Sequence, residues 1–387
     1  MKHRPRNPTR ASLPAAFSMA AIIAVAVTAQ AAPAPAAMTA APLPAQLKQL
    51  LHRFARAHSS FPGVALAVTT PKLTWSGAAG VDERATRKPL SATAGFRIAS
   101  VTKTFTAAAI LRLAEDGKLS LDDPIAKQLS PATAALLRRG GYDVDAIHVR
   151  NLLQHTSGLY DYADDQAFQT FVVSHPRHRW TRTEQIRFAI THGKPLFPPG
   201  TDFHYSDTGY VLLGEILERQ TGHSLAGAYR SLLGLDRLGL LHTYLETLEP
   251  TPAQATPPAH QYLGTTDTAG FDPSFDLYGG GGLVSTVNDL TRFYRALFAG
   301  RVFKNPATLR TMLGKPRSTR PGELSMGIFA ESVGRENCWH HDGFWGSTVV
   351  HCPRVGVTFA ITVDQADSFD RAIHELDAAV LRLVSRT

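Results

Sequence analysis

Cysteine is scarce in this chain, which has two among its 387 residues, Cys338 and Cys352. So few cysteines exclude a fold held together mainly by disulfides and the multi-cysteine zinc sites of small metal-bound domains. A hairpin that turns near Phe344 would place the two cysteines at similar positions along neighbouring strands. Only the cross-strand geometry decides whether they form a disulfide. No cysteine lies just after the N-terminal apolar run, so we expect no lipid anchor there.

Metal, nucleotide and nucleic-acid motifs are missing as well. The 16 histidines include no His-Glu-x-x-His pattern, and the adjacent His340 and His341 would point to opposite faces of a strand. The glycine run 279–282 lacks the Gly-Lys-Ser/Thr ending of a phosphate-binding loop, which favours a close-packed turn. No basic stripe interleaved with aromatic residues occurs. We therefore expect no metal, no cofactor and no nucleic-acid partner.

Acidic residues are absent from residues 1–31, where an apolar run over 15–29 ends in the small-residue site Ala29-Gln30-Ala31. The four basic residues before this run are Lys2, Arg4, Arg6 and Arg10. This pattern predicts a signal peptide cleaved after Ala31, and a secreted or periplasmic protein. A retained membrane anchor is the alternative, which the short, alanine-rich run disfavours. We expect residues 32–44, rich in alanine and proline, to form a flexible leader, and the mature chain to have no stable membrane span.

The net charge of the whole chain is +8, and removal of the four leader cations leaves +4. This mildly basic value suits an anionic cell-wall environment and does not by itself indicate nucleic-acid binding.

Hydrophobic periodicity predicts an α/β fold with strands near both ends of the chain. Strands are expected over 61–69, 73–81, 337–341, 347–352 and 355–364, with amphipathic helices over 45–58 and 368–384. The middle of the chain is rich in helices and loops, including helices over 183–192 and 208–221. We expect one domain over 45–387, in which a sheet layer (about 45–114 and 276–387) is interrupted by an all-helical insert (about 115–275).

Ser100 and Lys103 stand three residues apart at the start of a helix that is apolar nearly all round. Burial of such a helix should lower the pKa of Lys103, so that its amine accepts a proton and activates Ser100 as a nucleophile. The alternative is structural: Ser100 caps the helix and Lys103 extends to the surface. Ser-x-x-Lys alone does not decide between the two.

Two further motifs follow in order, Tyr205-Ser206-Asp207 and His341-Asp342-Gly343. With Ser-x-x-Lys they make the chain resemble the serine β-lactamase-related family, which includes class C β-lactamases, D-alanyl-D-alanine carboxypeptidases, esterases and D-aminopeptidases. Family-like surroundings are found at 96–104, 153–159, 198–207 and 280–289. The resemblance implies an antiparallel sheet flanked by helices, with a helical subdomain inserted.

The resemblance also implies roles for single residues. Ser100 attacks an acyl carbon, Lys103 holds or accepts its proton, and Tyr205, with a pKa depressed by the lysine, relays a proton to the leaving group. His341 lies at the sheet edge beside Tyr205 and tunes this network. The backbone N–H groups of Ser100 and Phe344 form the oxyanion hole. The structural alternatives are that Tyr205 only packs and that His341 is a surface histidine.

Two acidic residues depart from the family pattern. Asp207 replaces an asparagine that hydrogen-bonds the substrate amide; it should pair with Lys103 and favour the charged lysine. Asp342 replaces a threonine associated with binding a substrate carboxylate, and it repels anions if it faces the site. Arg335 is a candidate for a compensating charge. Together with Gly343 and Phe344, the two acids are our candidates for substrate binding.

We therefore expect an exported serine hydrolase that acts through an acyl-enzyme on small-molecule esters or on peptide and D-amino-acid amides. The runner-up is a D-alanyl-D-alanine carboxypeptidase or β-lactamase, whose substrate would be a peptide or a β-lactam. A third reading is a non-catalytic member that binds peptidoglycan peptides. The sequence leaves the oligomeric state open.

Overall fold

The computed structural model describes residues 41–315, 320, 324–366 and 369–385. The expected signal peptide, residues 1–31, lies outside this part of the chain, as does most of the expected leader over 32–44. Helix α1 (Leu43–Ala57) includes the last two residues of that expected leader. No helix in the described ranges is both long and apolar enough to span a membrane.

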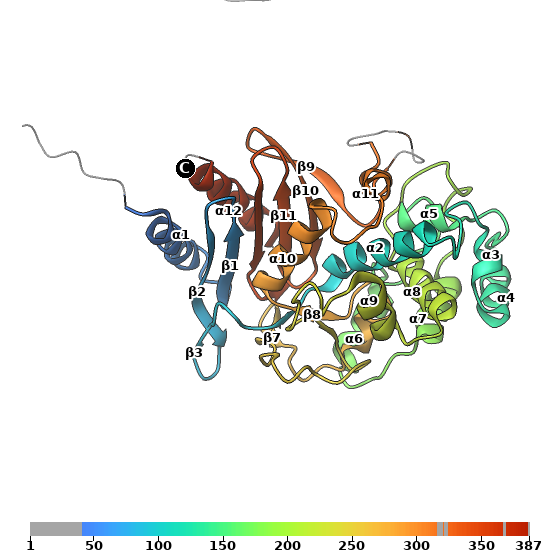
Figure 1. Cartoon of the computed structure of the whole chain (residues 1–387). Helices are drawn as coiled ribbons and strands as arrows, with labels where there is room; N and C mark the ends of the chain where they lie inside the picture. Colours follow the sequence, from blue (N-terminus) through green and yellow to red (C-terminus); the bar gives the residue numbers. More distant parts are fainter. Residues whose placement is uncertain (1–40, 316–319, 321–323, 367–368, 386–387) are drawn as a thin grey trace, which may run out of the picture. The chain divides into compact units, whose positions relative to one another are not determined.

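A seven-stranded sheet in the order β3-β2-β1-β12-β11-β10-β9 is the centre of the fold (Figure 1). Each neighbouring pair is antiparallel, as the family resemblance implied. The strands are β1 (Gly63–Thr69), β2 (Thr74–Glu83), β3 (Lys88–Pro89), β9 (Phe329–Val333), β10 (Glu336–Gly343), β11 (Ser347–Cys352) and β12 (Val357–Thr362). Pairing of Leu66 with Ile361 joins the two halves of the sheet across most of the chain.

The two faces of the sheet carry side chains of different size. On one face Leu66 and Phe359 pack under α1 and the C-terminal helix α12 (Phe369–Val384), which lie side by side. On the other face the small residues Ala65 and Ala360 join the larger core, where helix α10 (Val287–Phe298) crosses β1, β11 and β12. Strand alternation thus separates two cores with a single sheet between them.

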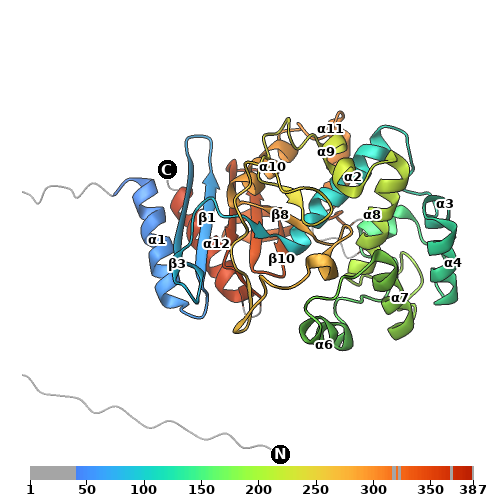
Figure 2. The same ribbon diagram turned by 90° about the horizontal axis from the view of Figure 1, so that it is seen from below.

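The segment between the two sheet halves is mostly helical, as expected, and Figure 2 shows its helices grouped away from α1. They are α3 (Ile125–Gln128), α4 (Pro131–Arg139), α5 (Val149–Leu153), α6 (Gln166–Ser174), α7 (Arg182–His192), α8 (Asp207–Thr221) and α9 (Leu225–Leu233). It also holds three two-residue strands, so the expectation of an all-helical insert was incomplete. These strands are β5 (Tyr244–Leu245), β6 (Tyr262–Leu263) and β7 (Thr266–Asp267).

Short strands from distant parts of the chain hold the insert against the rest of the domain. Strand β8 (Leu283–Ser285) pairs with β4 (Phe96–Arg97) and with β5, and β13 (Gln365–Ala366) pairs with β6. The remaining elements are the 3-10 turns η1 (Ala99–Val101) and η2 (Pro273–Asp276) and the helices α2 (Thr102–Glu115) and α11 (Pro306–Leu313).

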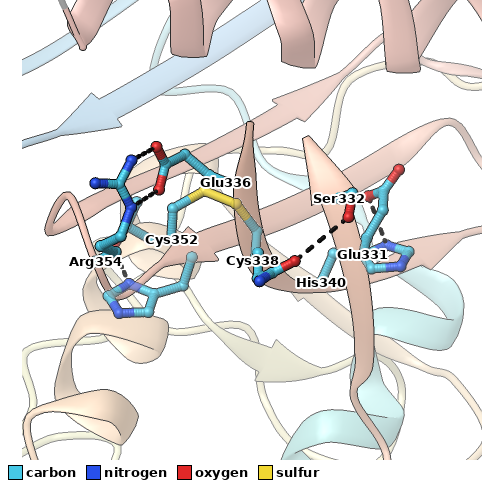
Figure 3. Close-up of a disulfide and its surroundings, with 10 residues drawn as sticks. Glu331, Ser332, Glu336, Cys338, His340, Cys352 and Arg354 are labelled. Atoms are coloured by element: carbon cyan, nitrogen blue, oxygen red, sulfur yellow. Dashed lines mark hydrogen bonds and ion pairs between the residues drawn. A yellow bond between two sulfur atoms is a disulfide. The ribbon is translucent and has the colours of Figure 1, made fainter. Parts of the chain in front are cut away.

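Cys338 and Cys352, whose pairing the sequence left open, form a disulfide between β10 and β11 (Figure 3). Their Cα atoms lie 4.2 Å apart across the ladder. The same two strands carry Ser347 and His341, which contribute to the site described next. The disulfide therefore links the two strands on which these residues stand.

Candidate active site

The start of α2 presents Ser100 in an unusual backbone conformation. Ala99, directly before it, has a positive φ of 43°, a region that costs a residue with a Cβ about 1–2 kcal/mol. Strain of this kind is found at functional sites, where the surrounding structure holds it in place. Ser100 does not cap the helix, because the N-cap position is Val101 and no side chain caps it. The structural alternative for Ser100 is therefore wrong.

The end of β10 is held directly against this turn. A Cβ added at Gly343 would lie 2.2 Å from the carbonyl oxygen of Ile98, so glycine is required for the approach. The hydroxyl of Ser347 donates a hydrogen bond to the same carbonyl at 3.1 Å. These contacts fix the third motif, His341 to Gly343, beside the first.

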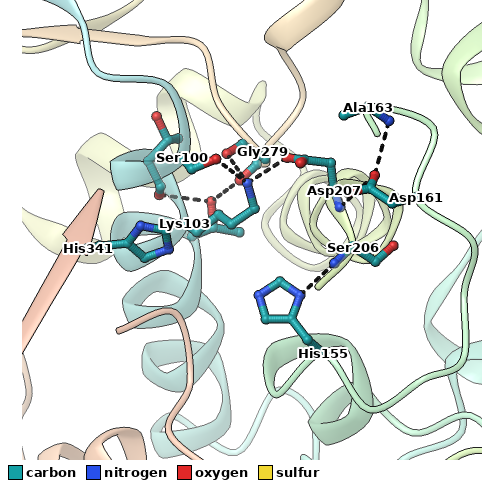
Figure 4. Close-up of polar contacts among 12 residues, drawn as sticks. Ser100, Lys103, His155, Asp161, Ala163, Ser206, Asp207, Gly279 and His341 are labelled. Carbon is teal, nitrogen blue, oxygen red and sulfur yellow. Dashed lines mark hydrogen bonds and ion pairs between the residues drawn. The ribbon is translucent and has the colours of Figure 1, made fainter. Parts of the chain in front are cut away.

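Lys103 is fully buried, with an exposed fraction of 0%, and its ammonium uses all three donors (Figure 4). Nζ donates to Ser100 Oγ at 2.8 Å, to Asp207 Oδ1 at 2.5 Å and to the carbonyl of Gly280 at 2.8 Å. The alternative that this lysine reaches the surface is therefore wrong.

The protonation of Lys103 differs from what burial alone predicts. Burial lowers the pKa of the amine, but the charge of Asp207 and the phenol of Tyr205 outweigh it, so the pKa of Lys103 is raised. The expectation of a neutral lysine base was wrong, whereas the expected pairing with Asp207 is present. Lys103 acts at this site as a cation beside the Ser100 hydroxyl.

Asp207 is the first residue of α8, and close backbone contacts hold its carboxylate toward Lys103. A Cβ on Gly280 would lie 2.5 Å from Asp207 Oδ1, so the missing side chain makes room for the carboxylate. The backbone N–H of Asp207 donates to Asp161 Oδ1 at 3.1 Å. Burial and then repulsion by Asp207 raise the pKa of Asp161 well above its usual value, which favours the neutral acid.

Tyr205 lies over Lys103, whose Nζ is 4.9 Å from the ring centroid. Burial raises the pKa of Tyr205, and the opposing effects of Lys103 and of hydrogen bonding to Lys103 and Ser100 do not reverse the shift. The expectation of a depressed pKa was wrong, and Tyr205 is a neutral phenol. Tyr205 nonetheless lies next to Lys103, so the second motif contacts the first, as expected.

His155 supports Tyr205 from behind. The two rings stack with centroids 4.3 Å apart, and His155 Nδ1 accepts a hydrogen bond from the backbone N–H of Ser206 at 3.0 Å. Burial, followed by the charge of Lys103, lowers the pKa of His155 well below its usual range, so the ring is neutral and can accept this bond.

His341 is buried and faces the Ser100 and Lys103 side of β10 (Figure 4). Its Nδ1 lies 2.8 Å from the carbonyl oxygen of Asp342, which favours a proton on Nδ1 and leaves Nε2 as the acceptor. Burial and then the charge of Lys103 lower the pKa of His341 to about 3, so the ring is neutral at pH 7. The alternative of a surface histidine is wrong. Pairing of β10 with β9 ends at His340, so His341 lies where the sheet edge opens.

Asp342 points to the opposite side of β10 from His341, toward His340. Its Oδ2 lies 3.4 Å from His340 Nδ1, and hydrogen bonding to His340 lowers the pKa of Asp342 despite the opposing effect of burial. The same carboxylate raises the pKa of His340 against the effect of burial. The charge of Asp342 is thus partly balanced. Arg335 lies in the β9–β10 turn at the far end of β10, so the expectation that it compensates at the site was wrong.

The three motifs meet at one cavity of about 770 Å³. Ser100, Tyr205, Asp207, His341, Asp342, Gly343 and Phe344 all line it. Its walls are largely aromatic: Tyr162, Phe168, Phe271, Phe275, Phe329 and Trp345. Phe344 is 48% exposed at its rim. No group of three or more potential metal ligands occurs in the part of the chain that the structure describes.

Sequence reasoning missed three residues of this site: His155, Asp161 and Asp276. His155 lies in a stretch that was noted for its family-like sequence, but nothing in that stretch shows that its ring stacks on Tyr205. Asp161 and Asp276 belong to no motif, and only the fold brings them next to Asp207.

Comparison with known proteins gives relatives with several activities in their names. Penicillin-binding protein 4* of Bacillus subtilis is 27% identical over 252 residues, 62% of this chain and 52% of that protein. Esterase EstB of Burkholderia gladioli is 28% identical over 297 residues, 70% of this chain and 74% of that protein. The chain thus spans about half the length of the Bacillus protein.

Solved structures resemble the chain over nearly their whole length. The D-amino acid amidase from Ochrobactrum anthropi SV3, complexed with D-phenylalanine, has a TM-score of 0.73 and 26% identity, and covers 88% of this chain and 99% of its own. A D-stereospecific amidohydrolase from Streptomyces sp. has a TM-score of 0.71 and 28% identity, with 86% and 98% covered. A family model described as Beta-lactamase matches residues 47–382. Because this match spans most of the sequence and the three motifs meet in one cavity, the chain belongs to the beta-lactamase family.

Proposed function

We propose that this protein is an exported serine hydrolase that cleaves esters and amides through an acyl-enzyme on Ser100. The observation that carries the proposal is the hydrogen bond of 2.8 Å from buried Lys103 to the Ser100 hydroxyl, at the wall of a cavity large enough for a small molecule. The names of the relatives, an esterase, two amidohydrolases and a penicillin-binding protein, support the same class of chemistry.

In this proposal Tyr205 carries the proton, because a neutral phenol can accept and donate in one step. Ser100 Oγ forms a bond to the acyl carbon and its proton passes to the phenol oxygen of Tyr205. The phenol proton passes to the leaving amine or alcohol as the bond between that group and the acyl carbon breaks. Water then attacks the acyl-enzyme, and its proton returns through Tyr205 to Ser100. Lys103 stays protonated and stabilises the negative charge that develops on Oγ.

The backbone N–H groups of Ser100 and Phe344 are the proposed oxyanion hole. Contact of Gly343 with Ile98 brings the Phe344 turn against the Ser100 turn, and no backbone or side-chain acceptor among the described residues takes the Phe344 amide. Hydrogen-bond donors stabilise an oxyanion most when their positions are fixed before the reaction. The strained turn at Ala99, packed against the end of β10, would fix both of these N–H groups.

We further propose that the acyl substrate is neutral or carries an amine, as in esters and amino-acid amides. Four acidic residues and no lysine or arginine line the described cavity, and the nearby ammonium of Lys103 is already paired with Asp207. A substrate ending in a carboxylate therefore meets no unpaired lysine or arginine there. Carboxypeptidase or β-lactamase action is the second candidate, which the similarity to Penicillin-binding protein 4* favours.

A substrate panel tests this proposal. Rates are measured with 4-nitrophenyl esters, D- and L-amino-acid 4-nitroanilides, nitrocefin and a D-Ala-D-Ala peptide, for the wild type and Ser100→Ala. We expect ester or anilide hydrolysis that Ser100→Ala reduces by at least about a thousandfold. Nitrocefin turnover without ester or anilide hydrolysis would favour the second candidate. If a fluorophosphonate labels the wild type no more than Ser100→Ala, the protein is a binding module and not a hydrolase.

Export is part of the same proposal. The disulfide between Cys338 and Cys352 supports it, because structural disulfides persist outside the reducing cytosol. N-terminal sequencing of the protein recovered from the envelope and the medium tests it. We expect a mature chain beginning at Ala32; an intact Met1 end on cytosolic protein would contradict export.

A further inference from the structure

The four acidic residues that line the cavity are not equivalent. Asp207 is paired with Lys103 and Asp342 with His340, so the charges of both are balanced by protein groups. Asp164 is exposed at the rim. Asp276 is half-buried, and in the described ranges its carboxylate accepts no hydrogen bond and forms no ion pair. A half-buried carboxylate with no protein partner, lining the same cavity as the nucleophile, is available to pair with a cationic group of the ligand.

The position of Asp276 places it next to the reacting groups. It ends η2, and a Cβ on Gly281 would lie 2.1 Å from its Oδ1. The preceding residue, Gly280, likewise has no Cβ that would collide with the carboxylate of Asp207. Its carbonyl oxygen accepts a hydrogen bond from Lys103. The two carboxylates therefore pack against adjacent glycines of one turn.

Lys103 cannot serve as the missing partner of Asp276. Its three N–H donors are already used by Ser100, Asp207 and the Gly280 carbonyl. The groups whose charges act on Asp276 are Asp207 and Glu246, which repel it, and Lys103 and Arg97, which attract it. Burial and then Asp207 prevail and raise the pKa of Asp276 to about 7, so its charge is weakly compensated.

The surroundings of Asp276 suit an organic cation. Phe275, the residue before it, and Trp345 line the same cavity, with ring centroids 6.3 Å apart in an edge-to-face arrangement. Aromatic faces attract ammonium groups and bury the carbon atoms attached to them. A carboxylate among aromatic rings thus combines a charge for the ammonium with an apolar surface for the rest of the acyl group.

We propose that Asp276 binds the ammonium group of the substrate's acyl part, so that the enzyme selects aminoacyl amides and esters with a free amine over their N-acylated or deamino analogues. This inference rests on the proposed function and names the group that sets its substrate class. Asp276 is thus a specificity-determining residue and takes no part in bond breaking.

A substrate pair tests the assignment. The ratio of kcat/KM for phenylalanine 4-nitroanilide to that for 3-phenylpropionyl 4-nitroanilide is measured at pH 8 for the wild type, Asp276→Asn, Asp276→Glu and Asp164→Asn. We expect Asp276→Asn to lower the ratio at least about tenfold, since a hydrogen bond to a charged group is lost, and Asp276→Glu to restore part of it. The matched variant Asp164→Asn, which removes an exposed carboxylate from the same cavity, should change the ratio less than twofold.

Binding without turnover separates this inference from the proposed function. Calorimetry with 2-phenylethylamine and with 2-phenylethanol is carried out on Ser100→Ala with and without Asp276→Asn. We expect the amine to bind at least about tenfold tighter than the alcohol only when Asp276 is present. Equal amine-to-alcohol affinity ratios with and without Asp276→Asn, or a kcat/KM ratio lowered by Asp164→Asn instead, would overturn the assignment even if hydrolysis is observed. A failure of hydrolysis with amine binding intact would instead overturn the proposed function.

Discussion

Lys103 and Asp207 show how one side chain sets the protonation of another. Burial favours the neutral amine of Lys103, but the carboxylate 2.5 Å from Nζ reverses that preference. The ion pair therefore supplies a positive charge next to the Ser100 hydroxyl and adds no net charge to the cavity. An asparagine at position 207 would leave the effect of burial without an opposing charge.

Replacing Asp207 by Asn is accordingly expected to change both the pH profile and the choice of substrate. The pKa of Lys103 falls because burial then dominates, so the rate gains a pH dependence that the wild type lacks. Below that pKa the lysine is an unbalanced cation, and nitrocefin, which is anionic, should be hydrolysed about tenfold faster than by the wild type. The measurement is kcat/KM for nitrocefin and for a neutral ester between pH 5 and 10.

Asp207→Ala is the control for this experiment, because it removes the charge without supplying an amide. A nitrocefin rate at or below that of the wild type, in folded Asp207→Asn protein, would show that electrostatics do not explain the substrate preference.

At the scale of elements, the site depends on close approach between a strand end and a helix start. Gly343 ends β10 and touches the carbonyl of Ile98, just before the strained Ala99. No side chain fits between the two segments, so their spacing is fixed by the backbone itself. The proposed oxyanion hole has one donor on each of these segments.

Gly343→Ala tests this dependence. The added Cβ would lie 2.2 Å from Ile98 O, so the β10–β11 turn must move away from Ser100. We expect a loss of at least about a hundredfold in kcat, comparable to removal of an oxyanion-hole donor, together with a lower Tm. Gly270→Ala is the matched control, since a Cβ there meets nothing within 4 Å, and it should leave both values unchanged. An unchanged kcat in Gly343→Ala would show that the position of the β10–β11 turn does not affect catalysis.

The disulfide links β10 and β11 on the sheet face that packs under α1 and α12. Cys338 and Cys352 are 14 residues apart, and closing a loop of this length stabilises a protein by about 3 kcal/mol. We expect the double variant Cys338→Ala and Cys352→Ala to lose roughly 2–4 kcal/mol of unfolding free energy while keeping most of its activity at low temperature. Urea unfolding monitored by fluorescence, with and without a reductant, measures this. A wild type insensitive to reductant would contradict a stabilising role.

At the scale of the whole molecule, buried acids make stability depend on pH. Asp364 follows β12, is fully buried and accepts a hydrogen bond from the Thr362 hydroxyl at 2.8 Å. Burial raises the pKa of Asp364 to about 7, and Asp82 adds to the shift. Between the unfolded pKa near 4 and about 7 the folded state binds the extra proton, so this group makes the protein less stable as the pH rises.

Asp364→Asn removes that proton linkage, and asparagine tolerates the positive φ of 52° at this position. The stability of the variant relative to the wild type is expected to increase from pH 4 to 7, by roughly 1.4 kcal/mol per pH unit at most, and then to level off. Tm measured across this range for both proteins checks the trend. A difference that stays constant with pH would show that Asp364 keeps an ordinary pKa.

The fold and the site differ in how far sequence could predict them. Apolar strand runs and the buried α2 helix are local signals, so β1, β2, β10, β11 and β12 were predicted close to their bounds. The edge strand β9 was not predicted. The pairing of β1 with β12 and the small strands β5 to β7 depend on contacts between distant segments, which periodicity does not contain.

Ser100, Lys103, Tyr205 and His341 were proposed from motifs. The pKa shift of Tyr205 was predicted with the wrong sign, and for Lys103 the prediction from burial was wrong whereas the one from Asp207 had the right sign. That sign depends on the balance between burial and a partner at a known distance, which only the structure supplies. Asp276 belongs to no motif, and only the folded cavity shows that its carboxylate has no partner among the residues that the structure describes.

The position of β12 between β1 and β11 has a consequence for biogenesis. The hairpin of β1 and β2 is synthesised before the helical segment, but its open edge is completed only by residues 357–362, which follow that whole segment. Until those residues are available the hairpin lacks a neighbour and most of the large sheet cannot assemble. Strand β12 therefore closes the sheet late in synthesis, and a chain truncated before Val357 would lack the strand that joins its two halves.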